Sequence, residues 1–486
     1  MKNNVWSKYV SRRLAVQVAL AWNFGFGQAM KKVYGLEINK ILVLRDKNKT
    51  DYYLDDKQHK KYIVGLYKLL KNKKFIKNFH QAAQLVLENI LANTKRVLGQ
   101  DLSLLTNKQL LSLYTNFILP NLEQFYIRMW TVFNIGEPLA ELVSQKLFLI
   151  LQDRARADKY LLKLSSPLVP NDVLNERLDS LRLAIKKPKV SAKNFRELLK
   201  KHCDKYRHIP MFDFDHLPYT YQYFYQEIKK IKKPAKELQE IKKLFASRRR
   251  EFKDIVSVLK ADRNFKNLLY FLKENVFLRD YRDMIRQKYN LELRKFYMAV
   301  GQRLSLNIDE VAILTNREII KYLKSGKKFP HSIIRQRKSA FLLKQENGAV
   351  EIFSGNEALR QAKQELNFTA KFKDQKIEGV TGASGKARGR VVLVFTNREL
   401  SKVKAGDVLV TTMTRQDFVP AIRKSAALVT DEGSVTCHAA IIARELGIPC
   451  IVRTKIGTSV LKDGDRVEVD ADKGIISRIS GTKRRR

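Results

Sequence analysis

Residues 430–449 read Thr-Asp-Glu-Gly-Ser-Val-Thr-Cys-His-Ala-Ala-Ile-Ile-Ala-Arg-Glu-Leu-Gly-Ile-Pro. The apolar run 426–429 before them predicts a buried strand, and the polar, glycine-bearing start of the segment predicts a turn. Residues 439–446 are rich in alanine and other good helix formers, and a glycine and a proline follow them, so they predict a short helix. Thr436 can cap that helix, which places His438 in its first turn.

A histidine at the start of a helix suits phosphate chemistry. The free N–H groups and the positive dipole end of the helix favour an anion. The same field disfavours the imidazolium form, so that the ring stays neutral and can attack phosphorus. The small residues Gly433 and Ala439 leave room for a phosphoryl group. A lone histidine here is more often a structural hydrogen-bonding residue, so the residues alone leave both roles open.

Glycine usage divides the chain of 486 residues, which is long enough for two or more domains. Ten of the 21 glycines lie in residues 1–378 and eleven in residues 379–486. Because glycine supplies the tight turns, the first part reads as helical and the last part as strand-rich. The sequence therefore predicts a multidomain protein, with an all-α N-terminal region followed by a C-terminal α/β domain.

Breaks in the helical pattern suggest where the domains divide. Residues 209–218 interrupt the helical periodicity, and Asn347-Gly348 between two apolar runs is a strong hairpin signal. Thr315 and Glu318 have the spacing of a capping box before a helix. The expected divisions are helical subdomains at 1–212 and 213–335, a hairpin-and-helix connector at 336–372, the strand-and-helix domain at 373–481 and a basic tail at 482–486.

Five stretches of residues 380–479 form a recognisable pattern. They are Gly-Lys-Ala-Arg-Gly-Arg-Val at 385–391, Lys-Ala-Gly-Asp-Val-Leu-Val at 404–410, Phe-Val-Pro-Ala at 418–421, the His438 segment, and Lys-Asp-Gly-Asp-Arg-Val-Glu-Val-Asp at 462–470. With these stretches, residues 380–479 resemble the mobile, swivelling phosphohistidine domain of the phosphoenolpyruvate-utilising enzymes, which include phosphoenolpyruvate synthase and pyruvate phosphate dikinase. The resemblance implies a β/β/α swivelling fold and a phosphohistidine at His438. In the synthase and the dikinase, the position of Thr436 is a regulatory phosphorylation site.

Two positions depart from the family pattern, which usually has glycine at both. Ser434 offers a hydroxyl but narrows the freedom of the backbone. Arg453 either supplies an extra cation for the phosphate or is a surface charge. Arg444 is expected to hold the helix in place with Glu445, and either Arg444 or Arg453 is a candidate to lie near the phosphate. Gly433 completes the set of expected supporting residues.

The sequence before this domain resembles neither an ATP-grasp domain nor a phosphoenolpyruvate-binding barrel. It contains no Gly-x-x-x-x-Gly-Lys-[Ser/Thr] motif, and residues 137–300 contain no glycine. Residues 277–315 weakly resemble the helical region of shortened family members. We therefore expect a phosphotransfer protein that depends on a partner protein for its nucleotide or phosphoenolpyruvate site. Phosphoenolpyruvate or ATP would be the indirect donor, Mg²⁺ would enter only through that partner, and whether this chain is itself a transferase stays open.

Other candidate sites and the cellular location follow from a few residues. His202, Cys203 and His208 match no common zinc-site spacing and have no evident fourth ligand, so no metal site is expected. The three cysteines are too few for a disulfide framework, which favours a reducing compartment. No run of 18 apolar residues occurs, so the expected location is cytoplasmic, with no membrane partner.

The charge of the chain supports an alternative function. Lys and Arg number 94 against 49 Asp and Glu, a formal net charge of +45. Such a charge suits a non-catalytic protein that binds nucleic acid or another acidic partner and merely retains the mobile-domain fold. The basic residues are spread over many predicted helices without a recognisable motif, which favours solvated helix faces over a nucleic-acid site.

Overall fold

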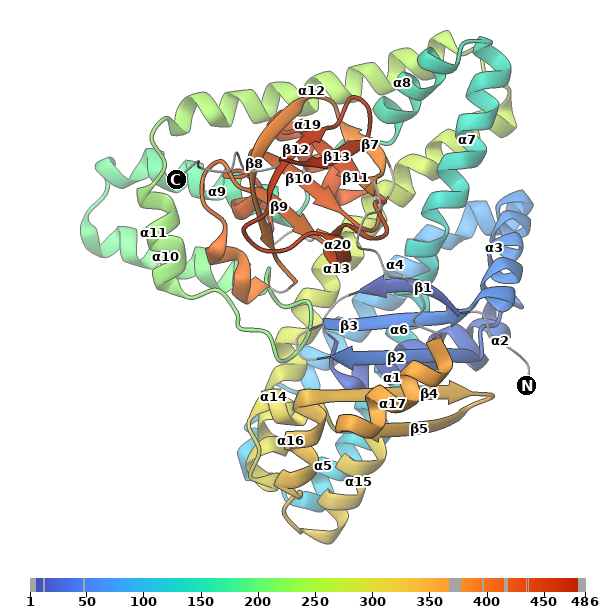
Figure 1. Ribbon diagram of the computed structural model, residues 1–486. Coiled ribbons are helices and arrows are strands. Elements are labelled where there is room, and N and C mark those ends of the chain that lie inside the picture. The colour runs from blue at the N-terminus through green and yellow to red at the C-terminus, as the bar shows by residue number, and fades with distance from the viewer. Residues whose placement is uncertain are drawn as a thin grey trace, which may run out of the picture. The chain divides into compact units, whose positions relative to one another are not determined.

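The computed structural model describes residues 6–11, 14–46, 49–366, 377–395, 397–414, 418–433, 435 and 437–479. The chain divides into two compact units, coloured by residue number in Figure 1. Unit 1 draws on Met1–Arg13, Lys40–His59 and Arg335–Arg486, and unit 2 on Leu14–Asn39 and Lys60–Ile334. The expected domain boundaries stay predictions. The one between residues 372 and 373 and the basic tail at 482–486 fall outside the described residues.

Unit 2 is helical, and its described residues contain no strand. Short π-helical turns at Gly25–Ala29 and Tyr114–Ile118 and 3₁₀ turns at Leu102–Leu104 and Lys187–Lys189 connect or extend its helices. The helices are α1 Val16–Phe24, α2 Met30–Tyr34, α3 Asp56–Lys71 (which starts in unit 1), α4 Lys73–Val97, α5 Asn107–Leu113, α6 Leu119–Asn134, α7 Gly136–Leu151, α8 Arg154–Leu164, α9 Asp172–Lys186, α10 Ala192–Tyr206, α11 Tyr221–Lys229, α12 Pro234–Val258, α13 Arg263–Leu304, α14 Ile308–Val311, α15 Asn316–Ser325 and α16 His331–Ser339 (which ends in unit 1).

Helix α13, with 42 residues, is the longest element of unit 2. Phe265, Leu268 and Leu272, at helical spacing in the sequence, are buried in a core to which α4, α7, α8 and α12 also contribute. The capping box at Thr315 is confirmed, since Glu318 N donates to Thr315 Oγ1 at 3.2 Å and Thr315 N donates to Glu318 Oε2 at 2.8 Å. Among the described residues, every helix is too short or too polar to cross a lipid bilayer.

The first sheet of unit 1 corrects the prediction of an all-α N-terminal region. Three of its strands come from the first 55 residues, in an antiparallel order β1-β3-β2-β4-β5. β2 pairs with β4 along its whole length, and the two are nearly 300 residues apart, so no local pattern reveals the pairing. Helix α17, Gly355–Leu366, packs on β4 and β5. The strands are β1 Trp6–Ser11, β2 Lys40–Asp46, β3 Lys49–Asp55, β4 Ala340–Glu346 and β5 Ala349–Ser354.

The predicted hairpin in this sheet is confirmed. β4 and β5 pair in register around Asn347-Gly348. Asn347 has φ 51° and Gly348 has φ 86°, and a tight two-residue hairpin turn needs positive φ at both central positions. The hairpin could be predicted because its signal is local.

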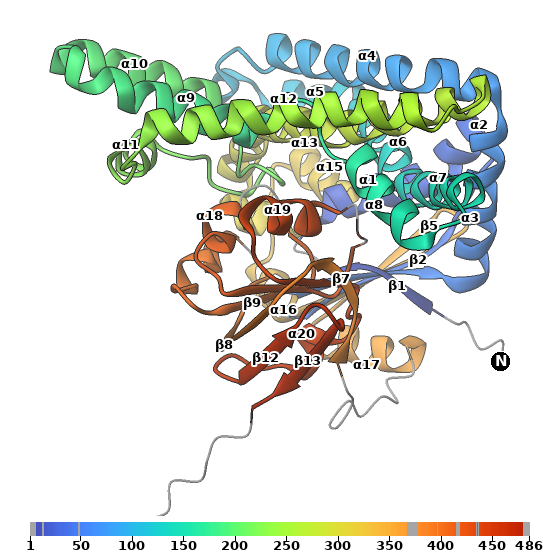
Figure 2. The same cartoon turned by 90° about the horizontal axis from the view of Figure 1, so that it is seen from above.

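The second sheet of unit 1 is formed by the C-terminal part of the chain, which the glycine pattern predicted to be rich in strands. β8, β9, β10 and β11 run parallel, and antiparallel strands extend both sides in the order β6-β13-β12-β8-β9-β10-β11-β7. Figure 2 shows helices α18 and α19 on the same side of the parallel strands. The elements are β6 Ile377–Glu378, β7 Val380–Ala383, β8 Lys386–Leu393, a 3₁₀ turn Asn397–Lys402, β9 Val408–Thr411, α18 Val419–Ile422, β10 Ala427–Thr430, α19 His438–Leu446, β11 Cys450–Val452, α20 Gly457–Val460, β12 Arg466–Asp470 and β13 Ile475–Arg478.

Candidate functional site

The segment around His438 folds as strand, turn and helix, as predicted. β10 is fully buried, and α19 begins at His438. The N-cap residue is Cys437, whose side chain makes no capping hydrogen bond. Thr436 and Ser434 themselves lie outside the described residues. His438 is thus the first helical residue, at the end of α19 where the helix dipole favours an anion.

The His438 ring is positioned by a residue that the sequence did not suggest. Its Nδ1 atom lies 3.0 Å from Oγ1 of Thr414, and its Nε2 atom is buried. Thr414 follows the end of β9 and is 5% exposed. If Nδ1 carries the proton and donates it to Thr414, the electron pair of Nε2 is available to an electrophile. Thr414 is 24 residues from His438 in the sequence, and no spacing rule links the two.

Two features of the structure favour glycine at position 433: its backbone conformation and the close approach of Cys437. The φ of Gly433 is 116°, a conformation that favours glycine, and a Cβ there would lie 2.7 Å from Cys437 Sγ. We expected a glycine at position 433 because it leaves room for a phosphoryl group, but the structure gives a different reason for it. The Cys437 side chain takes up the space beside Gly433, and the glycine allows the turn to close on itself.

Arg453 contacts the same turn. Its Nε atom donates to the carbonyl oxygen of Gly433 at 3.2 Å. Arg453 itself has φ 59°, in the left-handed region that glycine adopts most readily. That conformation gives a physical reason for the usual family glycine at this position. Here the arginine accepts the unfavourable backbone conformation and contacts the turn that precedes His438.

Arg444 links α19 to the sheet. Its Nη1 atom donates to the carbonyl oxygen of Gly382 on β7 at 2.7 Å. The helix and strand pack so closely that a Cβ on Gly382 would lie 3.2 Å from Cβ of Ala440. The structure thus brings Arg453 and Gly433 together at the turn and places the guanidinium of Arg444 on β7.

Asp431 was also missed in the sequence, although it starts the turn. The side chain is 6% exposed and accepts hydrogen bonds from Thr454 Oγ1 at 2.8 Å, from Thr458 N at 3.1 Å and from Thr458 Oγ1. A buried carboxylate is tolerated when it is hydrogen-bonded in this way. These bonds fix the beginning of the turn to α20 and to the loop before it.

The end of β1 contacts the two loops that surround the His438 turn. Ser11 N donates to Glu432 Oε1 at 2.6 Å, and Thr412 Oγ1 donates to the carbonyl oxygen of Ser11 at 2.6 Å. All three residues belong to unit 1. These contacts join positions about 400 residues apart, so the sequence carries no signal for them.

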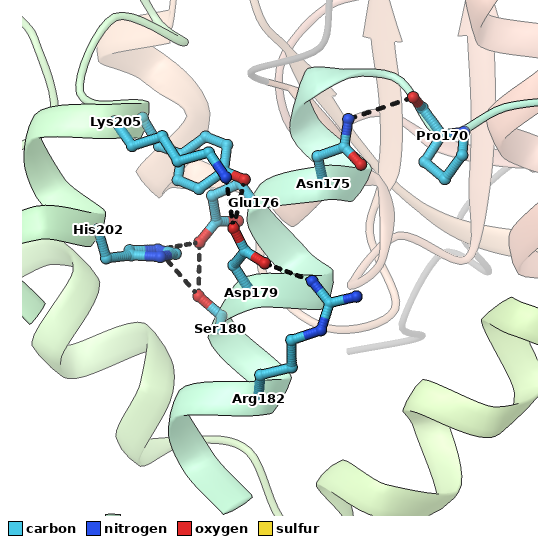
Figure 3. A network of polar contacts seen from close by, with 9 residues as sticks. Pro170, Asn175, Glu176, Asp179, Ser180, Arg182, His202 and Lys205 are labelled. Atoms are coloured by element: carbon cyan, nitrogen blue, oxygen red, sulfur yellow. Dashed lines mark hydrogen bonds and ion pairs between the residues drawn. The ribbon is translucent and has the colours of Figure 1, made fainter. Parts of the chain in front are cut away.

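His202 of α10 and His208, which follows that helix, form pairs with carboxylates of α9. His202 Nε2 lies 3.0 Å from Glu176 Oε1 and 3.2 Å from Ser180 Oγ, as Figure 3 shows. His208 Nε2 lies 2.6 Å from Asp172 Oδ2, and burial lowers the pKa of His208. No group of three or more potential metal ligands occurs in the described part of the chain. These residues join neighbouring helices of unit 2.

Comparisons with known proteins concern the C-terminal part of the chain. Residues 403–474 match the family model described as the PEP-utilising enzyme, mobile domain. A probable phosphoenolpyruvate synthase of Archaeoglobus fulgidus is 50% identical over 117 residues, which are 24% of this chain and 15% of that protein. The phosphoenolpyruvate synthase of Pyrococcus furiosus is 39% identical over 174 residues, which are 34% of this chain and 21% of that protein.

A crystal structure of aconitase X from Thermococcus kodakaraensis aligns with 22% of this chain and 100% of that chain, at 22% identity and a TM-score of 0.18. This similarity is too weak to support an argument. The chain spans 15% and 21% of the length of the two synthases. The matched segment includes Thr414, Asp431, Gly433, His438 and Arg453. Residues 403–474 are therefore similar to the mobile domain of the PEP-utilising enzymes.

Proposed function

We propose that this protein is a phosphotransfer protein related to phosphoenolpyruvate synthase, and that it carries a phosphoryl group on Nε2 of His438. The contact between His438 Nδ1 and Thr414 Oγ1, at the first residue of α19, is the observation that supports this most directly. It lies inside the segment that matches the mobile domain. A ring with one nitrogen fixed by a hydrogen bond presents the other nitrogen in a defined direction.

In the loading step, the electron pair of Nε2 forms a bond to phosphorus while the bond from phosphorus to the donor oxygen breaks. With phosphoenolpyruvate as donor, the enolate of pyruvate leaves and takes up a proton to give pyruvate. Nδ1 keeps its proton throughout and donates a hydrogen bond to Thr414 Oγ1. The N-terminal end of α19 stabilises the phosphoryl oxygens, an effect of about 0.3–1 kcal/mol at exposed sites and up to about 2 kcal/mol when partly buried.

The proposal requires two conformations of the site. Nε2 of His438 is buried in the present structure, so a donor can reach it only after the atom is uncovered. Motions of loops and domains on the microsecond-to-millisecond scale commonly gate access of this kind. The closed arrangement would protect a phosphoramidate from water between loading and delivery.

The donor and acceptor sites are proposed to lie on a partner protein. A barrel that binds phosphoenolpyruvate needs alternating strands and helices, and the described residues of unit 2 form helices only. The partner would supply the nucleotide or phosphoenolpyruvate site, together with any Mg²⁺. His438 would then act as a shuttle between that site and an acceptor.

Labelling with phosphate tests the proposal. The full chain is incubated with radiolabelled phosphoenolpyruvate, and separately with ATP labelled in its β- or γ-phosphate, each with and without an extract of the source cells. We expect a label that is lost in acid and stable in base, as a phosphoramidate is, and that is absent from the His438→Ala variant.

The matched control is His331→Ala, which removes an exposed histidine of unit 2 and should leave labelling unchanged. The proposal is wrong if no donor labels the wild-type chain, or if the label persists in His438→Ala. Comparison of the incubations with and without extract shows whether a partner is needed.

A further inference from the structure

Unit 2 contains a pocket of about 480 Å³ that the proposed function does not use. One wall is the segment before α9 with the first turn of that helix, and the other wall is the middle of α13. The lining is mainly apolar, with Leu168, Val169, Val276, Phe277 and Met284 among its residues. Pockets that bind small organic molecules in proteins typically have volumes of roughly 300–1,000 Å³ and a mainly apolar lining with a few polar groups.

The wall before α9 is fixed by hydrogen bonds to its backbone. Arg249 Nη1 donates to the carbonyl oxygen of Leu168 at 3.1 Å, and Asn175 Nδ2 donates to that of Pro170 at 3.3 Å. Figure 3 shows the second of these contacts. Asn171 caps α9 by accepting from Leu174 N at 3.0 Å. The pocket is therefore preformed, which lowers the cost of binding a ligand.

The charge of the lining is opposite to that of the protein. Asp172, Glu274 and Asp280 line the pocket with a single basic residue, Lys273, although Lys and Arg outnumber Asp and Glu by 94 to 49 in the whole chain. Asp172 is paired with His208, and Glu274 lies 3.3 Å from Lys273. The remaining carboxylate is that of Asp280.

The carboxylate of Asp280 makes few hydrogen bonds or ion pairs for a group in the lining of a pocket. It accepts one hydrogen bond, from Asn171 Nδ2 at 3.3 Å, and within the described part of the chain it forms no ion pair. Burial raises its pKa to about 6, although the charges of Arg279 and Arg282 act in the opposite direction. A sheltered carboxylate without a close cation is costly, and a cation brought by a ligand would offset that cost.

We propose that this pocket binds an organic cation with an apolar body, whose ammonium group pairs with the carboxylate of Asp280. The apolar part of the ligand contacts Val276, Phe277 and Met284, and its N–H groups donate to Asp280. The site belongs to unit 2 and does not depend on phosphorylation of His438, so each proposal can fail without the other.

Binding of 4-phenylbutylamine to the full chain tests the site. Its affinity is compared with those of the neutral 4-phenylbutanol and the anionic 4-phenylbutyrate, by saturation-transfer NMR and calorimetry at about pH 7.5, where Asp280 is ionised. We expect the amine to bind at least about tenfold more tightly than the alcohol, and the anion to bind least. Nonspecific binding of a cation is disfavoured by the net charge of +45.

Two variants separate the charge from the cavity. Asp280→Asn keeps the shape and should weaken binding of the amine about tenfold, with little effect on the alcohol. Met284→Trp fills the cavity while keeping Asp280, and should abolish binding of both. Asp254→Asn, which changes an exposed carboxylate of unit 2 outside the pocket, is the matched control and should leave binding unchanged.

The proposal is overturned if the amine does not bind at concentrations up to about 10 mM. It is also overturned if Asp280→Asn binds the amine as well as the wild type does, or if the alcohol or the anion binds more tightly than the amine. Circular dichroism of each variant confirms that it is folded before binding is compared.

Discussion

Asp431 in the His438 turn and Asp280 in the pocket of unit 2 are both sheltered carboxylates, but their surroundings differ. Asp431 accepts hydrogen bonds from three donors, the hydroxyl of Thr454 and the hydroxyl and backbone N–H of Thr458. Asp280 accepts one, from Asn171, and burial raises its pKa to about 6. The first carboxylate is satisfied within the fold, whereas the second carries an unfavourable charge.

The difference separates two ways of building a site. In the turn before His438, the polar groups form hydrogen bonds with one another, and these bonds fix the position of the imidazole ring. In the pocket, a charge is left without a close opposite charge, so the protein gives up stability that a ligand can restore. A sheltered aspartate is thus either a structural support or a binding group, and its hydrogen bonds distinguish the two.

The largest expected effect is that of Asp431→Ala. It leaves the hydroxyl and the backbone N–H of Thr458 without this acceptor, at about 1–3 kcal/mol for each group left unsatisfied, and it removes the shorter of the two hydrogen bonds of the Thr454 hydroxyl. We expect a loss of roughly 3 kcal/mol or more in the free energy of unfolding, measured by urea denaturation.

Glu468→Ala is the control for Asp431. Glu468 forms a partly exposed ion pair with Arg388 on the same sheet, and such pairs contribute about 0–1 kcal/mol. Equal losses for the two variants would show that Asp431 is not a structural support, and the comparison with Asp280 would fail.

Asp280→Asn should have an effect of the opposite sign. The pKa of Asp280 is raised from 3.8 to about 6, so the associated stability is present below pH 3.8 and is lost as the pH rises through about 6. Asparagine avoids that loss. Since one pKa unit corresponds to about 1.4 kcal/mol, we expect the variant to be more stable than the wild type by roughly 1–3 kcal/mol above pH 6.

This gain should disappear when urea denaturation is repeated below about pH 4. Asp101→Asn is the control, because hydrogen bonds from Ser103 lower the pKa of that exposed carboxyl, and its removal should give no gain at any pH. A stability of Asp280→Asn equal to that of the wild type at every pH would mean that Asp280 carries no unfavourable charge.

Gly433→Ala tests how tightly the His438 turn is closed. The added Cβ meets an unfavourable φ of 116° and would lie 2.7 Å from Cys437 Sγ. Gly464→Ala is the matched control, since its φ of 93° is also positive but open space surrounds it. We expect the control to lose about 1 kcal/mol in the free energy of unfolding, measured by thermal and urea unfolding, and Gly433→Ala to lose roughly 1 kcal/mol more. Equal costs would show that the turn is not tightly packed.

Thr414→Val should slow the loading of His438. Valine keeps the shape of threonine but cannot accept the Nδ1 proton, so the ring loses the contact that fixes its orientation and tautomer. We expect roughly tenfold slower labelling, within the range of about 10–100-fold found for partners that orient a histidine ligand. Thr414→Ser should label at close to the wild-type rate. A normal rate in Thr414→Val would show that the contact does not position the ring.

The sequence predicted those parts of the fold that depend on neighbouring residues. The hairpin at Asn347-Gly348, the capping box at Thr315 and the strand, turn and helix around His438 all have local signals. The pairing of β2 with β4 has no such signal, because it joins positions nearly 300 residues apart. β2 and β3 pair locally from Asp46 and Lys49 onward, and this hairpin was not predicted from the sequence. The scarcity of glycine in residues 1–378 suggested an all-α region instead.

The candidate site divides in the same way. His438 and Gly433 could be named from the sequence because a motif contains them, and Arg453 could be named because it departs from that motif. Thr414 and Asp431 act through contacts with residues 23 to 27 positions away, so only the packed structure identifies them. Asp280 becomes notable only once the segment before α9 packs on α13 and encloses it.

Heteronuclear NMR of the ring nitrogens of the seven histidines, before and after incubation with the phosphate donor, tests the central claim most directly. We expect the unphosphorylated His438 to carry its proton on Nδ1, and the loaded protein to show phosphorus coupling to Nε2 of that ring alone. A His438 ring protonated on Nε2, or phosphorus coupled to Nδ1 or to another histidine, would contradict the account.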